Sequence, residues 1–89
     1  MDIQLISGVF TIDEAEQLLR EIFQTKIAFH EKKIRIIHQD EEDIKHSERR
    51  IIQLQETLRQ AISRLRKSGK THTALNAHIE VNTIGQLTP

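Results

Sequence analysis

The 89-residue sequence contains no cysteine, so neither a disulfide nor a thiolate-bound zinc ion can stabilise the fold. It contains no tryptophan or tyrosine and three phenylalanines, so most residues that anchor interfaces or stack on nucleic-acid bases are missing. No apolar run approaches the roughly 20 residues that cross a bilayer, and the first residues lack the pattern of a signal peptide. These absences predict a soluble, cytoplasmic protein without a membrane partner.

The charges balance in total but not along the chain. Thirteen basic and thirteen acidic residues give a net charge of zero, from which bulk electrostatics predicts no polyanionic partner. Residues 1–43 nevertheless carry a net charge of −5, and residues 44–89 carry +5. Halves of opposite charge attract one another within a hairpin or between antiparallel chains. The asymmetry therefore predicts that the halves pair, but it does not decide whether they belong to one chain or to two.

A long stretch from residue 12 to residue 67 contains neither glycine nor proline and has strong helical patterns. Thr11 and Glu14 have the spacing of a capping box, which predicts a helix beginning at residue 12. Apolar residues then recur at helical intervals over a broad face. From Ile44 to Leu65 they alternate three and four residues apart, as in the a/d seam of a coiled coil. Gly69 suits the left-handed position after the last turn.

The order of charges favours two helices over one. A single helix, on the order of 80 Å long at ~1.5 Å per residue, would form a coiled-coil dimer and is the alternative. However, the cations at 32–35 are followed at once by the acidic run 40–43. Cations suit the end of one helix and anions the first turn of the next, with Asp40 as the N-cap. The fold class predicted is therefore mainly α, an antiparallel hairpin with helices near 12–38 and 41–67.

Short β-like segments flank the helical stretch. Ile3–Ile6 has β character before Ser7-Gly8 interrupts it, and residues 77–81 alternate with a period of two. A hairpin brings both segments to one end, where they could form an antiparallel ribbon within a chain or across a dimer. Two strands alone are marginally stable, so the ribbon needs support from the helices or a second copy. We predict one domain over 1–84 and a flexible tail over 85–89.

The first helix is apolar over too broad a face for one partner helix. Ile27, Ile34 and Ile36 widen its stripe, whereas two helices of about 27 residues share one line of contact. The sequence therefore predicts a homodimer that forms a four-helix bundle, or binding to another helical protein. The candidate interface residues are large apolar residues on the two stripes: Leu19, Phe23, Ile27, Ile34, Ile37, Ile51, Leu54, Leu58 and Leu65.

No motif for catalysis, metal binding or cofactor binding has the residue spacing that its chemistry requires. No nucleophile, base and carboxylate arrangement is recognisable, so we predict no enzyme and no cofactor. His38, Glu42 and His46 would have metal-ligand spacing in a continuous helix, but the predicted turn separates them. Residues 68–71 resemble the end of a phosphate-binding loop, yet Arg64 stands where the first glycine is needed.

The predicted function is a non-enzymatic interaction or scaffold module that acts through helix–helix association. The alternative is a small nucleic-acid-binding or regulatory protein that uses the basic second helix, with Arg64, Arg66 and Lys67 as a patch. The zero net charge and the scarcity of aromatics argue against nucleic acid. His30 shares a heptad position with Phe23, so if buried it would make the assembly sensitive to pH near ~6.5.

Overall fold

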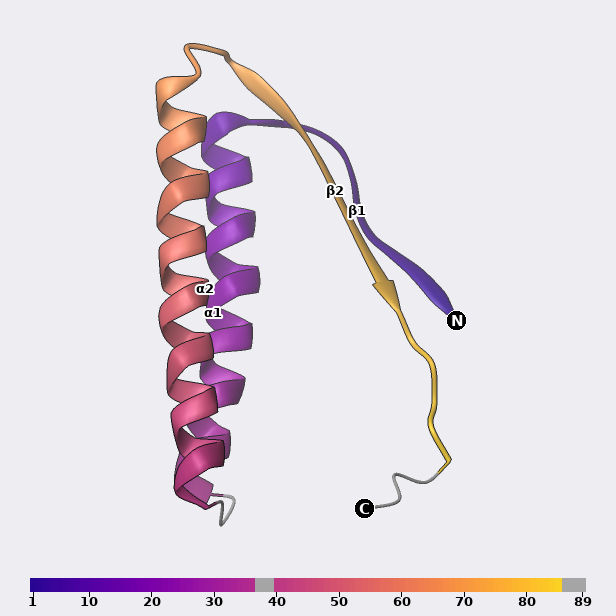
Figure 1. Ribbon diagram of the computed structural model, residues 1–89. Coiled ribbons are helices and arrows are strands. Elements are labelled where there is room, and N and C mark those ends of the chain that lie inside the picture. The colour runs from indigo at the N-terminus through magenta and orange to yellow at the C-terminus, as the bar shows by residue number, and fades with distance from the viewer. Residues whose placement is uncertain (37–39, 86–89) are drawn as a thin grey trace.

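The computed structural model describes residues 1–36 and 40–85 and contains four elements (Figure 1). These are β1 (Asp2–Thr11), α1 (Ile12–Ile36), α2 (Glu41–Lys67) and β2 (His72–Glu80). The two helices lie side by side and antiparallel, and the two strands form an antiparallel ribbon at the open end of the hairpin. The chain therefore folds as two helices and not as one continuous helix. The predicted helical residues 37–38 lie outside the described residues.

Both helix starts are encoded by local hydrogen bonds. At α1, the Thr11 amide donates to Glu14 Oε1 at 2.9 Å, and the Glu14 amide donates to Thr11 Oγ1 at 3.1 Å, which confirms the capping box. At α2, the Asp43 amide donates to Asp40 Oδ1 at 2.8 Å, which confirms Asp40 as the N-cap. Gly69 follows the C-cap with a φ of 70°, the left-handed conformation expected of it.

The ribbon is longer than the predicted segments, Ile3–Ile6 and 77–81, so those bounds are wrong. β1 continues through Ser7-Gly8, and β2 begins at His72. Ser7-Gly8 stays extended because it pairs with residues 75–76 of the opposite strand. Pairing with the opposite strand stabilises this extended conformation, which the sequence pattern of either strand alone does not predict.

A β-bulge at Leu5 decides which residues share a face of the ribbon. Ile3 pairs with Ile79 and Ile6 pairs with Ala77, with a register shift between the two pairs. Because Ala77 and Ile79 lie on one face of β2, the bulge brings Ile3 and Ile6 to that face despite their odd spacing. The resulting apolar face of the ribbon consists of Ile3, Ile6, Gly8, Phe10, Thr73, Leu75, Ala77 and Ile79.

The core of the single chain is thin. In the parts of the chain that the structure describes, the buried apolar side chains are Ala15 on α1 and Leu54, Leu58 and Ile62 on α2. The three α2 residues are spaced four apart and form one row along the helix that packs on α1. Ser47 continues this buried row toward the start of α2. The contact between the two helices is therefore the main source of buried apolar surface.

We expect Leu54→Ala to lower the free energy of unfolding by about 2–5 kcal/mol, because truncation leaves a cavity at a position that is 9% exposed. Chemical denaturation at a fixed protein concentration measures this change. Gln53→Ala at the exposed neighbouring position is the control and should change stability by less than ~0.5 kcal/mol. A change that small at Leu54 would contradict the packing described above.

Candidate interaction surfaces

One candidate surface is a side of α1 that carries exposed apolar side chains. Leu18, Ile22 and Phe29 lie along this side at helical spacing, and Phe29 is 56% exposed. Lys26 Nζ lies 5.3 Å from the centroid of the Phe29 ring, a cation–π contact that covers only part of it. The breadth of the apolar stripe predicted an extra contact for this helix, but Ile22 and Phe29 were not among the predicted interface residues.

The apolar face of the ribbon continues this surface. Near the hairpin, Phe10 of β1 and Leu18 of α1 line one shallow groove. Farther along, the ribbon runs away from the helices toward the N-terminus (Figure 1), and Ile3 and Ile79 are exposed. The ladder extends beyond the strand ends, because the Val81 amide donates to the Met1 carbonyl at 2.8 Å. The single chain therefore leaves the far half of this apolar face open.

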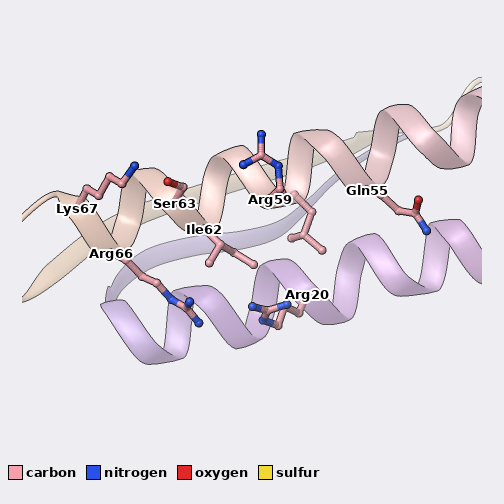
Figure 2. Close-up of a pocket in the computed structure, with 8 residues that line it drawn as sticks. Arg20, Gln55, Arg59, Ile62, Ser63, Arg66 and Lys67 are labelled. Carbon is pink, nitrogen blue, oxygen red and sulfur yellow. The ribbon is translucent and has the colours of Figure 1, made fainter.

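A second surface is a groove of about 520 Å³ between the two helices. Its floor is apolar, with Leu58 and Ile62, and its rim is basic. Figure 2 shows Arg66 reaching from α2 toward α1, while the strands run behind the helices. Arg20 and Phe29 are nine positions apart, or 2.5 helical turns, so the groove and the first surface lie on opposite sides of α1. The lining residues are Arg20, Gln55, Leu58, Arg59, Ile62, Ser63, Arg66 and Lys67.

Carboxylates balance much of the positive charge around the groove. Glu16 Oε1 accepts from Arg20 Nη2 at 3.1 Å and also from Arg66, and these hydrogen bonds, with that from Arg20 foremost, lower the pKa of Glu16. Glu56 accepts from Arg59 at 2.6 and 3.0 Å, which lowers the pKa of Glu56 and raises that of Arg59. The Arg59–Glu56 pair is exposed and therefore contributes to orientation more than to stability, whereas Glu16 is half-buried between its two arginines.

The predicted basic patch is not one surface. Arg64, Arg66 and Lys67 are all exposed, but Arg64 and Arg66 are two positions apart and point to different sides of α2. The groove instead brings Arg66 and Lys67 together with Arg20 and Arg59. Sequence reasoning missed the last two because their grouping depends on how α1 lies against α2.

The charge of α1 differs from that of the acidic half of the chain in which it lies. α1 carries five acidic and five basic residues and is neutral. The negative charge of the first half comes mainly from the run 40–43, which belongs to the start of α2. Opposite charges therefore meet at the ends of the helices, as Glu16 and Arg66 do, and not along whole helices.

The predicted interface residues are largely used within the single chain. None of those that the structure describes is exposed, and Ile37 lies outside the described residues. Leu54 and Leu58 are buried, and the rest are half-buried: Leu19, Phe23, Ile27, Ile34, Ile51 and Leu65. A second molecule can reach only the remaining surface of these side chains.

His30 is a buried polar residue on α1. It is 8% exposed, and neither ring nitrogen has a hydrogen-bond partner among the described residues. Burial is the main cause that lowers its pKa, and the nearby charges of Lys26, Lys33, Arg50 and His46 lower it further. Among the charges that act on His30 there is no carboxylate with an opposing effect, so the folded chain disfavours protonation of this imidazole.

We expect acidification to weaken the fold through His30. Because the folded pKa lies below the ordinary value of 6.5, the unfolded chain binds this proton more readily, and stability is lost as the pH falls below that value. Denaturant unfolding at about pH 7.5 and about pH 5.5 measures the loss, and His30→Leu should reduce it. The lowered pKa values of Glu16 and Glu56 also reduce stability in acid, but only as the pH falls below the ordinary carboxyl pKa of 4.5. An equal loss in wild type and variant would refute this assignment.

No group of three or more histidine, aspartate or glutamate side chains within 1–36 and 40–85 is placed to hold a metal ion, and His38 lies outside these ranges. No helix in the described chain is long and apolar enough to cross a bilayer. The fold defines a helical hairpin with a terminal two-stranded ribbon. Comparisons with protein-family models, curated proteins and solved structures find no match to this chain.

Proposed function

We propose that this chain is a non-enzymatic interaction or scaffold module that acts through helix–helix association, first with a second copy of itself. The observation that supports this is the balance between buried and open apolar surface. Few apolar side chains are buried in the described chain, while Ile22, Phe29 and Ile52 on the helices and Ile79 on the ribbon are exposed. Small domains with thin cores commonly depend on a partner, and open apolar patches mark association sites.

The two open surfaces give the hairpin two places to associate. A second hairpin packed on one side would complete a four-helix bundle, in which each helix contacts two neighbours. The opposite side, with Phe29 and the apolar face of the ribbon, would remain for another helical protein. A module with one self-association surface and one further surface is suited to a scaffold role.

We expect sedimentation equilibrium at micromolar concentration to show a homodimer. A stably folded monomer over the whole concentration range would contradict the proposal. Binding to nucleic acid that weakens steeply with salt, and that is lost when Arg64, Arg66 and Lys67 are changed to glutamine, would instead favour the nucleic-acid function. A matched variant, Lys45→Gln at the opposite end of α2, controls for loss of charge alone.

A further inference from the structure

α2 carries a second row of residues at heptad spacing, beside the buried row. Successive members are four, three, four, three and four positions apart, which keeps them on one side of the helix. Ile52 in this row is 63% exposed, and Glu48 has no ion-pair partner among the described residues. Four members line the groove. We call this row the α2 seam: Glu48, Ile52, Gln55, Arg59, Ile62 and Arg66.

The α2 seam is complementary to itself when two copies run antiparallel. Its intervals read the same from either end, so Glu48 falls opposite the second copy's Arg66. In the same register Ile52 falls opposite Ile62, at the floor of the groove, and Gln55 falls opposite Arg59. The three matches are an ion pair in which Glu48 joins Glu16 at Arg66, an apolar contact, and a hydrogen bond from Arg59, which also contacts Glu56. A parallel pairing would instead place Glu48 on Glu48 and Arg66 on Arg66, which like charges oppose.

The ends of α2 favour the same orientation. The first turn is acidic over Glu41–Asp43, and the last turn is basic at Arg64, Arg66 and Lys67. In this register the acidic turn of each α2 falls opposite residues 71–73 of the other copy, at least four residues beyond Lys67, so the two ends attract at a distance, whereas a parallel pairing would place acidic turn on acidic turn. The Glu48–Arg66 match and the antiparallel order of the charged ends therefore favour a second copy as the occupant of the groove.

α1 has a matching row, whose first member, Gln17, also lines the shallow groove beside Phe10 and Leu18. Its members are three, four, three, four and three positions apart, again the same from either end. In an antiparallel pair Arg20, which lines the groove, falls opposite Glu31 of the second copy. The half-buried Ile27 falls opposite Gln24, and Ile34 opposite Gln17. We call this row the α1 seam: Gln17, Arg20, Gln24, Ile27, Glu31 and Ile34.

A single two-fold axis can serve both seams. The α2 seam has its midpoint at Thr57, nine residues before Arg66, and the α1 seam has its midpoint nine to ten residues after Glu16. The tips of the Arg66 and Glu16 side chains are in contact, so these two residues lie at similar heights in the hairpin. Both helices rise by ~1.5 Å per residue, so the two midpoints also lie at similar heights. One two-fold axis that crosses both helices can therefore relate each seam to its copy.

We propose that a second copy of this chain docks on the groove side of the hairpin, α2 against α2 and α1 against α1, around one two-fold axis. This proposal rests on the self-association proposed above and adds its surface, orientation and register. Ile52 of each copy enters the other copy's groove above Leu58 and Ile62. The four helices then form the bundle, and the apolar face of the ribbon stays outside it.

Cysteine cross-linking tests the register, since the natural chain contains no cysteine. Glu48→Cys and Arg66→Cys are made in separate chains, each is oxidised alone, and the two are then mixed and oxidised. The mixture should form a disulfide-linked heterodimer, because positions 48 and 66 face each other. Neither variant alone should cross-link, because equal positions lie about 27 Å apart along the axis and a disulfide spans about 6 Å between Cα atoms.

The outcomes separate this proposal from the one on which it rests. Cross-linking of Glu48→Cys alone would mean a parallel seam and would overturn the register. A dimer in sedimentation without cross-linking in the mixture would overturn the seam while leaving self-association intact. A folded monomer would overturn both.

A matched pair of variants tests the apolar contact. Ile52→Glu should weaken the dimer at least ~10-fold, because it places a charge in the other copy's apolar groove. Thr57→Glu adds the same charge at an exposed position on the opposite side of α2 and should change the dissociation constant by no more than about 2-fold. Far-UV circular dichroism should show unchanged helix content in both, since both positions are exposed in the single chain. Equal effects of the two variants would overturn the proposal.

Discussion

The packing of α2 on α1 is the contact on which the rest of the structure depends. Leu54, Leu58 and Ile62 are three of the four buried apolar side chains in the described residues, and the hairpin that they hold returns the chain to its starting end. This return allows β1 and β2 to pair, and the Ile12 amide donates to the Thr71 carbonyl at 3.3 Å where the strands meet the helices. The ribbon contains too little buried surface to form by itself. Pairing of the termini is therefore a consequence of the helical contact.

The local signals in the sequence predicted the helices well, because each signal acts within a few residues. The Thr11–Glu14 box, the Asp40 cap and Gly69 each specify a boundary through hydrogen bonds or backbone conformation of neighbouring positions. The strands were predicted too short, because Ser7-Gly8 is extended only through its pairing with the opposite strand. A sequence pattern read along one segment cannot contain that contribution.

The candidate surfaces were predicted less well for a similar reason. The width of the α1 stripe indicated a second contact, but it did not say which residues would face α2 and which would stay open. Ile27 and Ile34, expected at the interface, are half-buried, while Phe29 is exposed. The grouping of Arg20 with Arg59 depends on the offset between the helices, which the contact between Glu16 and Arg66 reports and periodicity does not.

That offset also limits what a partner can be. A helix with heptad spacing offers two usable sides about a quarter turn apart, and α2 uses one for α1 and presents Ile52 on the other. Any helix could fill an apolar groove, but the groove here has charges in a fixed order along it. An occupant that matches them offers a carboxylate near Arg66, which also contacts Glu16, and an apolar side chain above Ile62, four residues apart and in reverse direction. The chain's own Glu48 and Ile52 meet this requirement, so the simplest occupant consistent with both the charges and the spacing is an antiparallel second copy.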